Sequence, residues 1–127
     1  NNIRKALNFG HTAGHAFESL AMRQNRPILH GFAVAYGMIL EIDLSVKICG
    51  FPEKKLNEFT RWLLNIYGKF EISTIDFEQL YELMTHDKKN EAGRINFTLL
   101  SETGKIEINQ NCEKEMILKA LEYYRKL

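Results

Sequence analysis

Three of the four histidines in this sequence, His11, His15 and His30, lie in one short stretch. On a helix, His11 and His15 lie about one turn apart on the same face. His30 opens the next apolar run, where a helical hairpin would fold it back toward them. Arg4 and Asn8, also four residues apart, add a guanidinium and an amide to the same polar face. Imidazole, guanidinium and amide groups in this arrangement indicate a site for a divalent metal or a phosphate.

The residues around His11 argue against one class of metal enzyme. The spacing His11-x-x-x-His15 matches the two-histidine helix of zinc hydrolases, but Thr12 stands where those enzymes carry the general-base glutamate. A zinc protease is therefore not favoured. Gly10 and Gly14 bracket His11, and glycine weakens a helix unless another group must approach closely. We expect a substrate or a second backbone to pass at these glycines.

Composition limits the domain count and the classes of partner. The chain has 127 residues with 45% hydrophobic content, which is enough for one packed core. Seventeen basic and sixteen acidic residues give a net charge of +1, so no overall field attracts nucleic acid or an anionic membrane. The longest apolar stretch, 32–42, is too short to span a bilayer. Cys49 and Cys112 form no C-x-x-C pair and are expected to be reduced thiols of a cytoplasmic protein.

The apolar periodicity predicts a mainly α fold, a helical bundle with a small β-hairpin near the C-terminus. Thr12 is the expected N-cap of the first helix after the glycines. The predicted elements are helices over 12–22, 30–47, 52–67, 76–84 and 113–124, a polar loop over 85–93, and alternating strands around 95–99 and 106–108. A further helix is expected to be under way at 3–7, and the chain, which starts with Asn1 rather than methionine, is expected to be a piece of a longer protein.

Three strings of residues, read together, resemble one enzyme family. The first is Arg4-x-x-Leu-Asn8-x-Gly-His11-Thr-x-Gly-His15-Ala-x-Glu, the second is Leu-His30-Gly-x-Ala-Val-Ala-x-Gly-Met, and the third is Asp-Lys88-Lys89 before a Gly-x-Ile-x-Phe hairpin. In order and spacing they resemble 3-dehydroquinate synthase over essentially the whole chain. The resemblance covers the family's C-terminal helical domain. It implies that residues 1–127 form a single domain, and that an N-terminal α/β domain, which binds NAD in this family, is absent.

The resemblance implies a reaction as well as a fold. The family is a carbon–oxygen lyase of the shikimate pathway, which leads to the aromatic amino acids. It converts 3-deoxy-D-arabino-heptulosonate 7-phosphate to 3-dehydroquinate and phosphate, with NAD reduced and reoxidised in each turnover. A bound zinc, or cobalt, acts as Lewis acid on the hydroxyl being oxidised. Because the active site lies between the two domains, the isolated piece is expected to be inactive.

Metal and catalytic roles follow from the resemblance, residue by residue. His11 and His30 match two metal ligands, and the third, a glutamate, belongs to the absent domain. His15 matches a catalytic histidine that contacts the substrate and helps to move protons. The family usually has glutamate after His30-Gly31, whereas this chain has Phe32. We interpret the family's glutamate as a support for the metal histidine.

Substrate roles follow in the same way. Arg4 and Asn8 match substrate-binding positions, where a guanidinium and an amide would meet charged groups and hydroxyls of the substrate. Lys88, and less closely Lys89, match a substrate-binding lysine, with Lys88 also counted as catalytic. The implied partners are a small phosphorylated sugar acid, the protein's own N-terminal domain and a second copy in a homodimer.

Three alternatives remain open at this stage. A sister sugar-phosphate cyclase, forming rings of the valiolone or inosose type, would share the histidines and the Asp-Lys-Lys turn. A metal-dependent alcohol dehydrogenase of the glycerol dehydrogenase type would keep the two-histidine helical domain but would not need Arg4 or Lys88. A helical interaction module would use its histidines only structurally.

Overall fold

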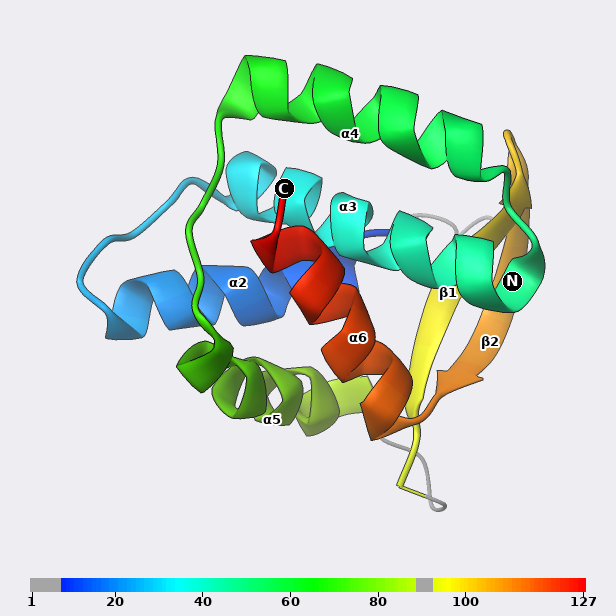
Figure 1. Cartoon of the computed structure of the whole chain (residues 1–127). Coiled ribbons are helices and arrows are strands. Elements are labelled where there is room, and N and C mark those ends of the chain that lie inside the picture. The colour runs from blue at the N-terminus through cyan, green and yellow to red at the C-terminus, as the bar shows by residue number, and fades with distance from the viewer. Residues whose placement is uncertain (1–7, 89–92) are drawn as a thin grey trace.

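The computed structural model describes residues 8–88 and 93–127, with 87 and 88 as backbone only. The predicted helix at 3–7 lies outside this part of the chain. The elements follow one another as α2 (His11–Arg23), α3 (His30–Cys49), α4 (Glu53–Tyr67), the short 3-10 helix η1 (Thr74–Asp76), α5 (Phe77–Lys88), β1 (Ile95–Glu102), β2 (Lys105–Cys112) and α6 (Lys114–Arg125). The prediction of a mainly helical domain with one hairpin near the C-terminus is confirmed (Figure 1).

Helix α3 is the centre of the molecule. It contacts α2, α4, α6 and β1, and Figure 1 shows α4 running along one side of it and α6 crossing in front of it. Its sequence is apolar on more than one face, as expected for a helix that is covered on several sides. Gly50, with a φ of 73°, ends the helix in the left-handed conformation.

The start of α2 differs from the prediction. Gly10, with a φ of 83°, is the N-cap, while Thr12 is buried inside the first turn and makes no cap. No side chain of α2 itself caps the helix. Two amides of this turn, at Gly10 and Ala13, donate instead to the carboxylate of Glu41, which lies on α3.

Glycines let α2 and α3 cross at very short range. A Cβ on Gly37 of α3 would lie 2.2 Å from the carbonyl oxygen of Gly10 and 2.4 Å from the amide nitrogen of Gly14. A Cβ on Gly14 would in turn lie 3.0 Å from the Cα of Val34. Of the two explanations offered for these glycines, the second backbone is therefore correct. The crossing sets the distance between the helices that carry the histidines.

The C-terminal half contributes β1 and α6, which both pack against α3. Strands β1 and β2 pair antiparallel, and Ile95, Phe97 and Leu99 point inward from β1. The fully buried Tyr124 of α6 donates from its hydroxyl to the carbonyl of Phe70 at 2.7 Å.

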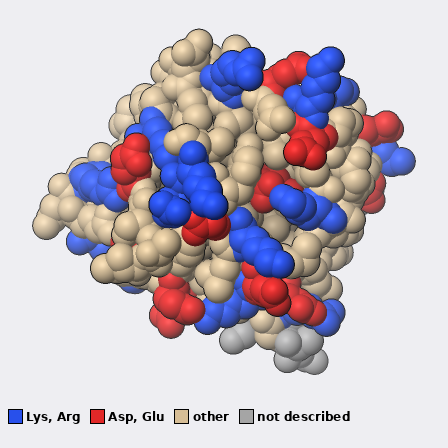
Figure 2. Space-filling view, in the orientation of Figure 1, with Lys and Arg blue, Asp and Glu red and all other residues tan. Residues whose placement is uncertain are grey.

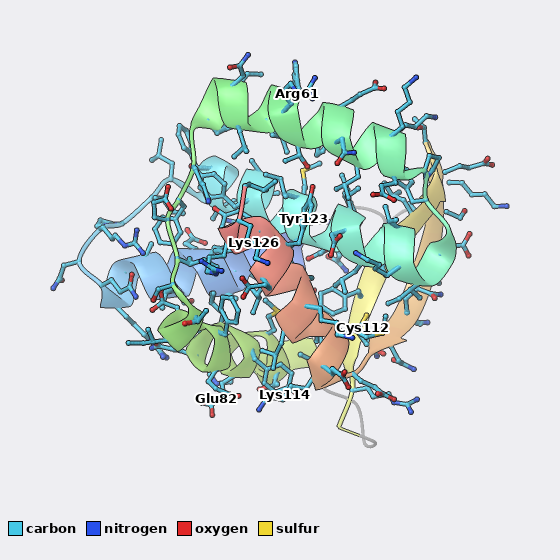
Figure 3. The ribbon with its side chains drawn as sticks, viewed as in Figure 1. Arg61, Glu82, Cys112, Lys114, Tyr123 and Lys126 are labelled. Atoms are coloured by element: carbon cyan, nitrogen blue, oxygen red, sulfur yellow. The ribbon has the colours of Figure 1, made fainter. Side chains whose placement is uncertain are left out.

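Neighbouring Tyr123 lies between α6 and α4 (Figure 3), where its hydroxyl is 3.4 Å from that of Thr60.

The predicted polar loop over 85–93 is wrong at its start, because α5 continues to Lys88. Two large apolar side chains of α4, Trp62 and Ile66, are exposed.

The surface carries both signs of charge. On the face shown in Figure 2, Lys and Arg side chains are interspersed with Asp and Glu. None of the helices in the described part of the chain has the length and apolar character needed to cross a bilayer. Both cysteines are free thiols: Cys49 is half-buried, and Cys112 lies buried at the junction of β2 and α6 (Figure 3).

Candidate metal centre

The three histidines meet at one place. The ring centroids of His11 and His15 are 5.6 Å apart, those of His11 and His30 are 5.6 Å apart, and those of His15 and His30 are 5.8 Å apart. Each histidine offers one nitrogen, and these nitrogens lie within 4.8 Å of one another. His11 is half-buried, and the other two rings are exposed. The predicted hairpin geometry, with His30 folded back toward His11 and His15, is therefore present.

A carboxylate orients the histidine from α3. The Nδ1 atom of His30 lies 3.1 Å from an Oε atom of Glu18, which is on α2. With Nδ1 donating to this carboxylate, Nε2 is the nitrogen left to bind a metal. Sequence reasoning gave Glu18 no role, although the signal was present. Glu18 follows His11 and His15 at positions seven and three residues later, so all three share one face of α2.

Phe32 occupies the position where the resemblance leads us to expect a glutamate. Its ring packs edge-to-face against Tyr67 of α4, with 4.9 Å between the centroids. Because Glu18 holds Nδ1 of His30, this histidine has a carboxylate partner without an acidic residue at position 32. In this chain Phe32 instead joins α3 to α4 beside the histidines.

An apolar cavity of about 430 Å³ opens beside the cluster, between α3 and α4. His11 and His30 contribute to its wall, and Met38, Trp62 and Tyr67 are among the apolar side chains that line the rest. The hydroxyl of Tyr36 donates to the carbonyl of Tyr67 at 3.1 Å, which ties the end of α4 to α3. Burial raises the pKa of Tyr36 above its ordinary value of 10.0. Sequence reasoning did not assign α4 to the site.

The predicted substrate-binding residues are only partly described. Asn8 is exposed just before α2, and its carbonyl accepts from the amide of His11 at 2.9 Å. Arg4 and Lys89 lie outside the described residues. Lys88 is the last residue of α5, and its side chain is also outside the description.

The histidines suit a divalent transition metal. Imidazole nitrogen is a preferred ligand of zinc and cobalt, and a second hydrogen bond from a ligating histidine to a carboxylate is typical of such sites. The three nitrogens and the Glu18 contact supply both features. By this donor chemistry, the residues present fit a divalent transition metal such as zinc or cobalt.

Comparison with known proteins identifies the family. Residues 1–90 match the family described as 3-dehydroquinate synthase C-terminal. The chain therefore belongs to the 3-dehydroquinate synthase C-terminal family. It is 56% identical over 124 residues to the 3-dehydroquinate synthase of Parabacteroides distasonis, and 38% identical over 125 residues to that of Macrococcus caseolyticus. Each match covers 98% of this chain but only 35% and 32% of the respective relative, so the chain spans about a third of the length of these synthases.

A related cyclase shares the fold of this family member. The crystal structure of a 2-deoxy-scyllo-inosose synthase complexed with carbaglucose-6-phosphate, NAD+ and Co2+ matches 94% of this chain and 32% of its own, with a TM-score of 0.71 and 28% identity. A second structure of a 2-deoxy-scyllo-inosose synthase, at 24% identity and a TM-score of 0.67, supports the fold alone. This domain is thus similar to sugar-phosphate cyclases as well as to 3-dehydroquinate synthases.

Proposed function

We propose that this chain is the metal- and substrate-binding domain of a 3-dehydroquinate synthase, which eliminates phosphate from 3-deoxy-D-arabino-heptulosonate 7-phosphate and closes the ring of 3-dehydroquinate. The observation that carries the proposal is the meeting of His11, His15 and His30 from two helices, in a chain of this family. The rest of the protein would supply the NAD site and the remaining metal ligand. Alone, the domain would be inactive.

His11 and His30 would hold the metal, with zinc as the proposed ion and cobalt as a substitute. The metal would supply Lewis-acid polarisation of the substrate hydroxyl that is oxidised. Glu18 would fix the ring of His30 through Nδ1. His15, which is exposed at the edge of the cluster, would contact the substrate and carry a proton to or from it.

Cationic and amide groups would bind the two ends of the substrate. Arg4, Lys88 and Lys89 would neutralise its phosphate and carboxylate, and exposed Asn8 would bind a hydroxyl. Lys88 is proposed as the catalytic member of the pair. We also propose a cytoplasmic homodimer in which this domain packs against its own NAD-binding domain.

A sister cyclase is the second candidate, because a 2-deoxy-scyllo-inosose synthase shares both the fold and 28% identity with this chain. Such an enzyme would take a sugar phosphate without a carboxylate. Its substrate would therefore make less use of the cationic residues. Glucose 6-phosphate, whose carba analogue is bound by the inosose synthase, is the probe for this activity.

The test uses a chimera in which this chain replaces the matching 35% of the Parabacteroides distasonis 3-dehydroquinate synthase. With NAD and zinc, the chimera should release phosphate from the heptulosonate phosphate without net accumulation of NADH. Release of phosphate from glucose 6-phosphate alone would favour the sister cyclase, and net NADH would favour a dehydrogenase. A folded chimera that binds zinc and NAD but turns over none of these substrates would refute the proposal.

A further inference from the structure

Glu41 is a buried carboxylate in the middle of α3. Its side chain is 0% exposed, although the helix around it is largely apolar. One oxygen accepts from the amide of Gly10 at 2.8 Å, and the other accepts from the amide of Ala13 at 2.9 Å. A buried charge is costly unless hydrogen bonds compensate it, and the first amides of a helix have no partner within their own helix. The contact therefore gives hydrogen-bond partners both to the buried carboxylate and to the amides at the start of α2. The dipole of α2 favours a negative charge at this end of the helix.

These two amides bracket His11. The turn that contains this histidine is thus held to α3 by a side chain, in addition to the backbone packing at Gly37, where a Cβ would lie 2.2 Å from the carbonyl oxygen of Gly10. Gly37 and Glu41 are four residues apart, so they act from one face of α3. His30 is the first residue of the same helix. The turn that carries His11 is therefore held against the helix that begins at His30 by contacts from Gly37 and Glu41.

We propose that Glu41 is a positioning residue of the metal site, which acts through the backbone of Gly10 and Ala13 to aim the ring of His11 at the position shared with His30. The inference rests on the proposed function, because it assumes that these histidines bind a metal. Loss of groups that orient metal-binding histidines typically lowers metal affinity 10-fold to 100-fold. If Glu41 only stabilised the fold, metal affinity of the folded protein would not change.

The control is a second buried acid on the same helix. Asp43 is 2% exposed, lies two residues beyond Glu41, and accepts from Lys47 at 2.8 Å. Positions two apart on a helix face different directions, so Asp43 does not share the Glu41 contact with the start of α2. Asp43→Asn therefore removes a buried carboxylate from α3 without touching the turn that carries His11.

The experiment measures equilibrium binding of Co2+ to the chimera by its visible absorption, with circular dichroism to establish folding. Glu41→Gln keeps the size of the side chain but places an amide donor against one of the two backbone amides. It should raise the dissociation constant about 10-fold or more and change the visible bands, while Asp43→Asn should stay within about twofold of the unsubstituted chimera. Glu41→Asp keeps the carboxylate on a shorter side chain, and it should lower the cobalt affinity less than Glu41→Gln does.

The outcomes separate this inference from the proposed function. A folded Glu41→Gln variant with unchanged affinity and spectrum would overturn the positioning role, even if the chimera turned over the heptulosonate phosphate. If Glu41→Gln did not fold, unchanged affinity in Glu41→Asp would overturn it. A chimera that bound cobalt in the expected way but released no phosphate would refute the function and leave the role of Glu41 standing. Absence of cobalt binding by the unsubstituted chimera would refute both.

Discussion

Gly37→Ala should disrupt the crossing of α2 and α3. The new Cβ would lie 2.2 Å from the carbonyl oxygen of Gly10, 2.4 Å from the amide nitrogen of Gly14 and 2.8 Å from its Cα. All three atoms belong to backbone, so no change of rotamer relieves the clash. Reaching an ordinary contact distance requires the helices to separate by roughly 1 Å, and overpacking of this kind costs about 3 kcal/mol.

Part of this cost is offset, because alanine favours a helix over glycine by about 1 kcal/mol. The net loss should be about 2 kcal/mol, which for a domain of this size lowers the melting temperature by about 8 °C. The separation would also move His30 away from His11, so the cobalt affinity of the chimera should fall with the stability.

The assay is thermal unfolding of the 127-residue chain followed by circular dichroism, together with cobalt titration of the chimera. Gly31→Ala is the matched control, because Gly31 lies on the same helix and a Cβ there would meet nothing within 4 Å. The control should melt at or slightly above the temperature of the unsubstituted chain. If Gly37→Ala had the same melting temperature as the control and bound cobalt normally, the close crossing of α2 and α3 would not be what sets the positions of the histidines.

His11→Ala and His30→Ala in the chimera should each abolish tight zinc binding, and stoichiometric zinc retained after dialysis by either variant would show the ligand assignment to be wrong. Tyr124→Phe should lower the free energy of unfolding by about 1 kcal/mol, because its buried hydroxyl donates to the carbonyl of Phe70, and urea unfolding with an unchanged midpoint would contradict this. Burial raises the pKa of the Cys112 thiol from 9.0 to about 12, so the unfolded chain loses this proton first as the pH rises. The stability that this thiol contributes is therefore complete well below pH 9 and should fall by about 1 kcal/mol between pH 8 and 10 in urea unfolding. Cys112→Ala should show a smaller loss, because burial also raises the pKa of Cys49.

Much of the fold could be predicted because helical periodicity and breaker residues agree along the chain. The helix predicted over 30–47 is α3, which ends at Gly50, and the alternating apolar residues Ile95, Phe97 and Leu99 of β1 are buried as predicted. One error occurs where a distant residue decides the local structure. Thr12 looks like an N-cap, but the amides of that turn are bound by Glu41 of another helix, and this tertiary contact replaces the local one.

For the candidate site, too, the features that local sequence patterns encode could be predicted, and the features that depend on tertiary packing could not. The meeting of His11, His15 and His30 could be predicted, because two of them share a helix face and the third follows a short turn. The role of Glu18 could also have been inferred from its spacing on α2. The cavity beside the histidines could not, because it depends on where α4 lies against α3, and no local pattern encodes that placement.

Helix α3 carries His30, which we propose as a metal ligand, and also forms the middle of the core. Occupancy of the proposed site and integrity of the tertiary structure would therefore be thermodynamically linked, and an ion at a hundred times its dissociation constant would add about 2.7 kcal/mol to the free energy of unfolding. Molecules without the ion spend more time open and accessible to proteases. The lifetime of the protein in the cell would then follow the supply of the metal, quite apart from the reaction that the metal supports.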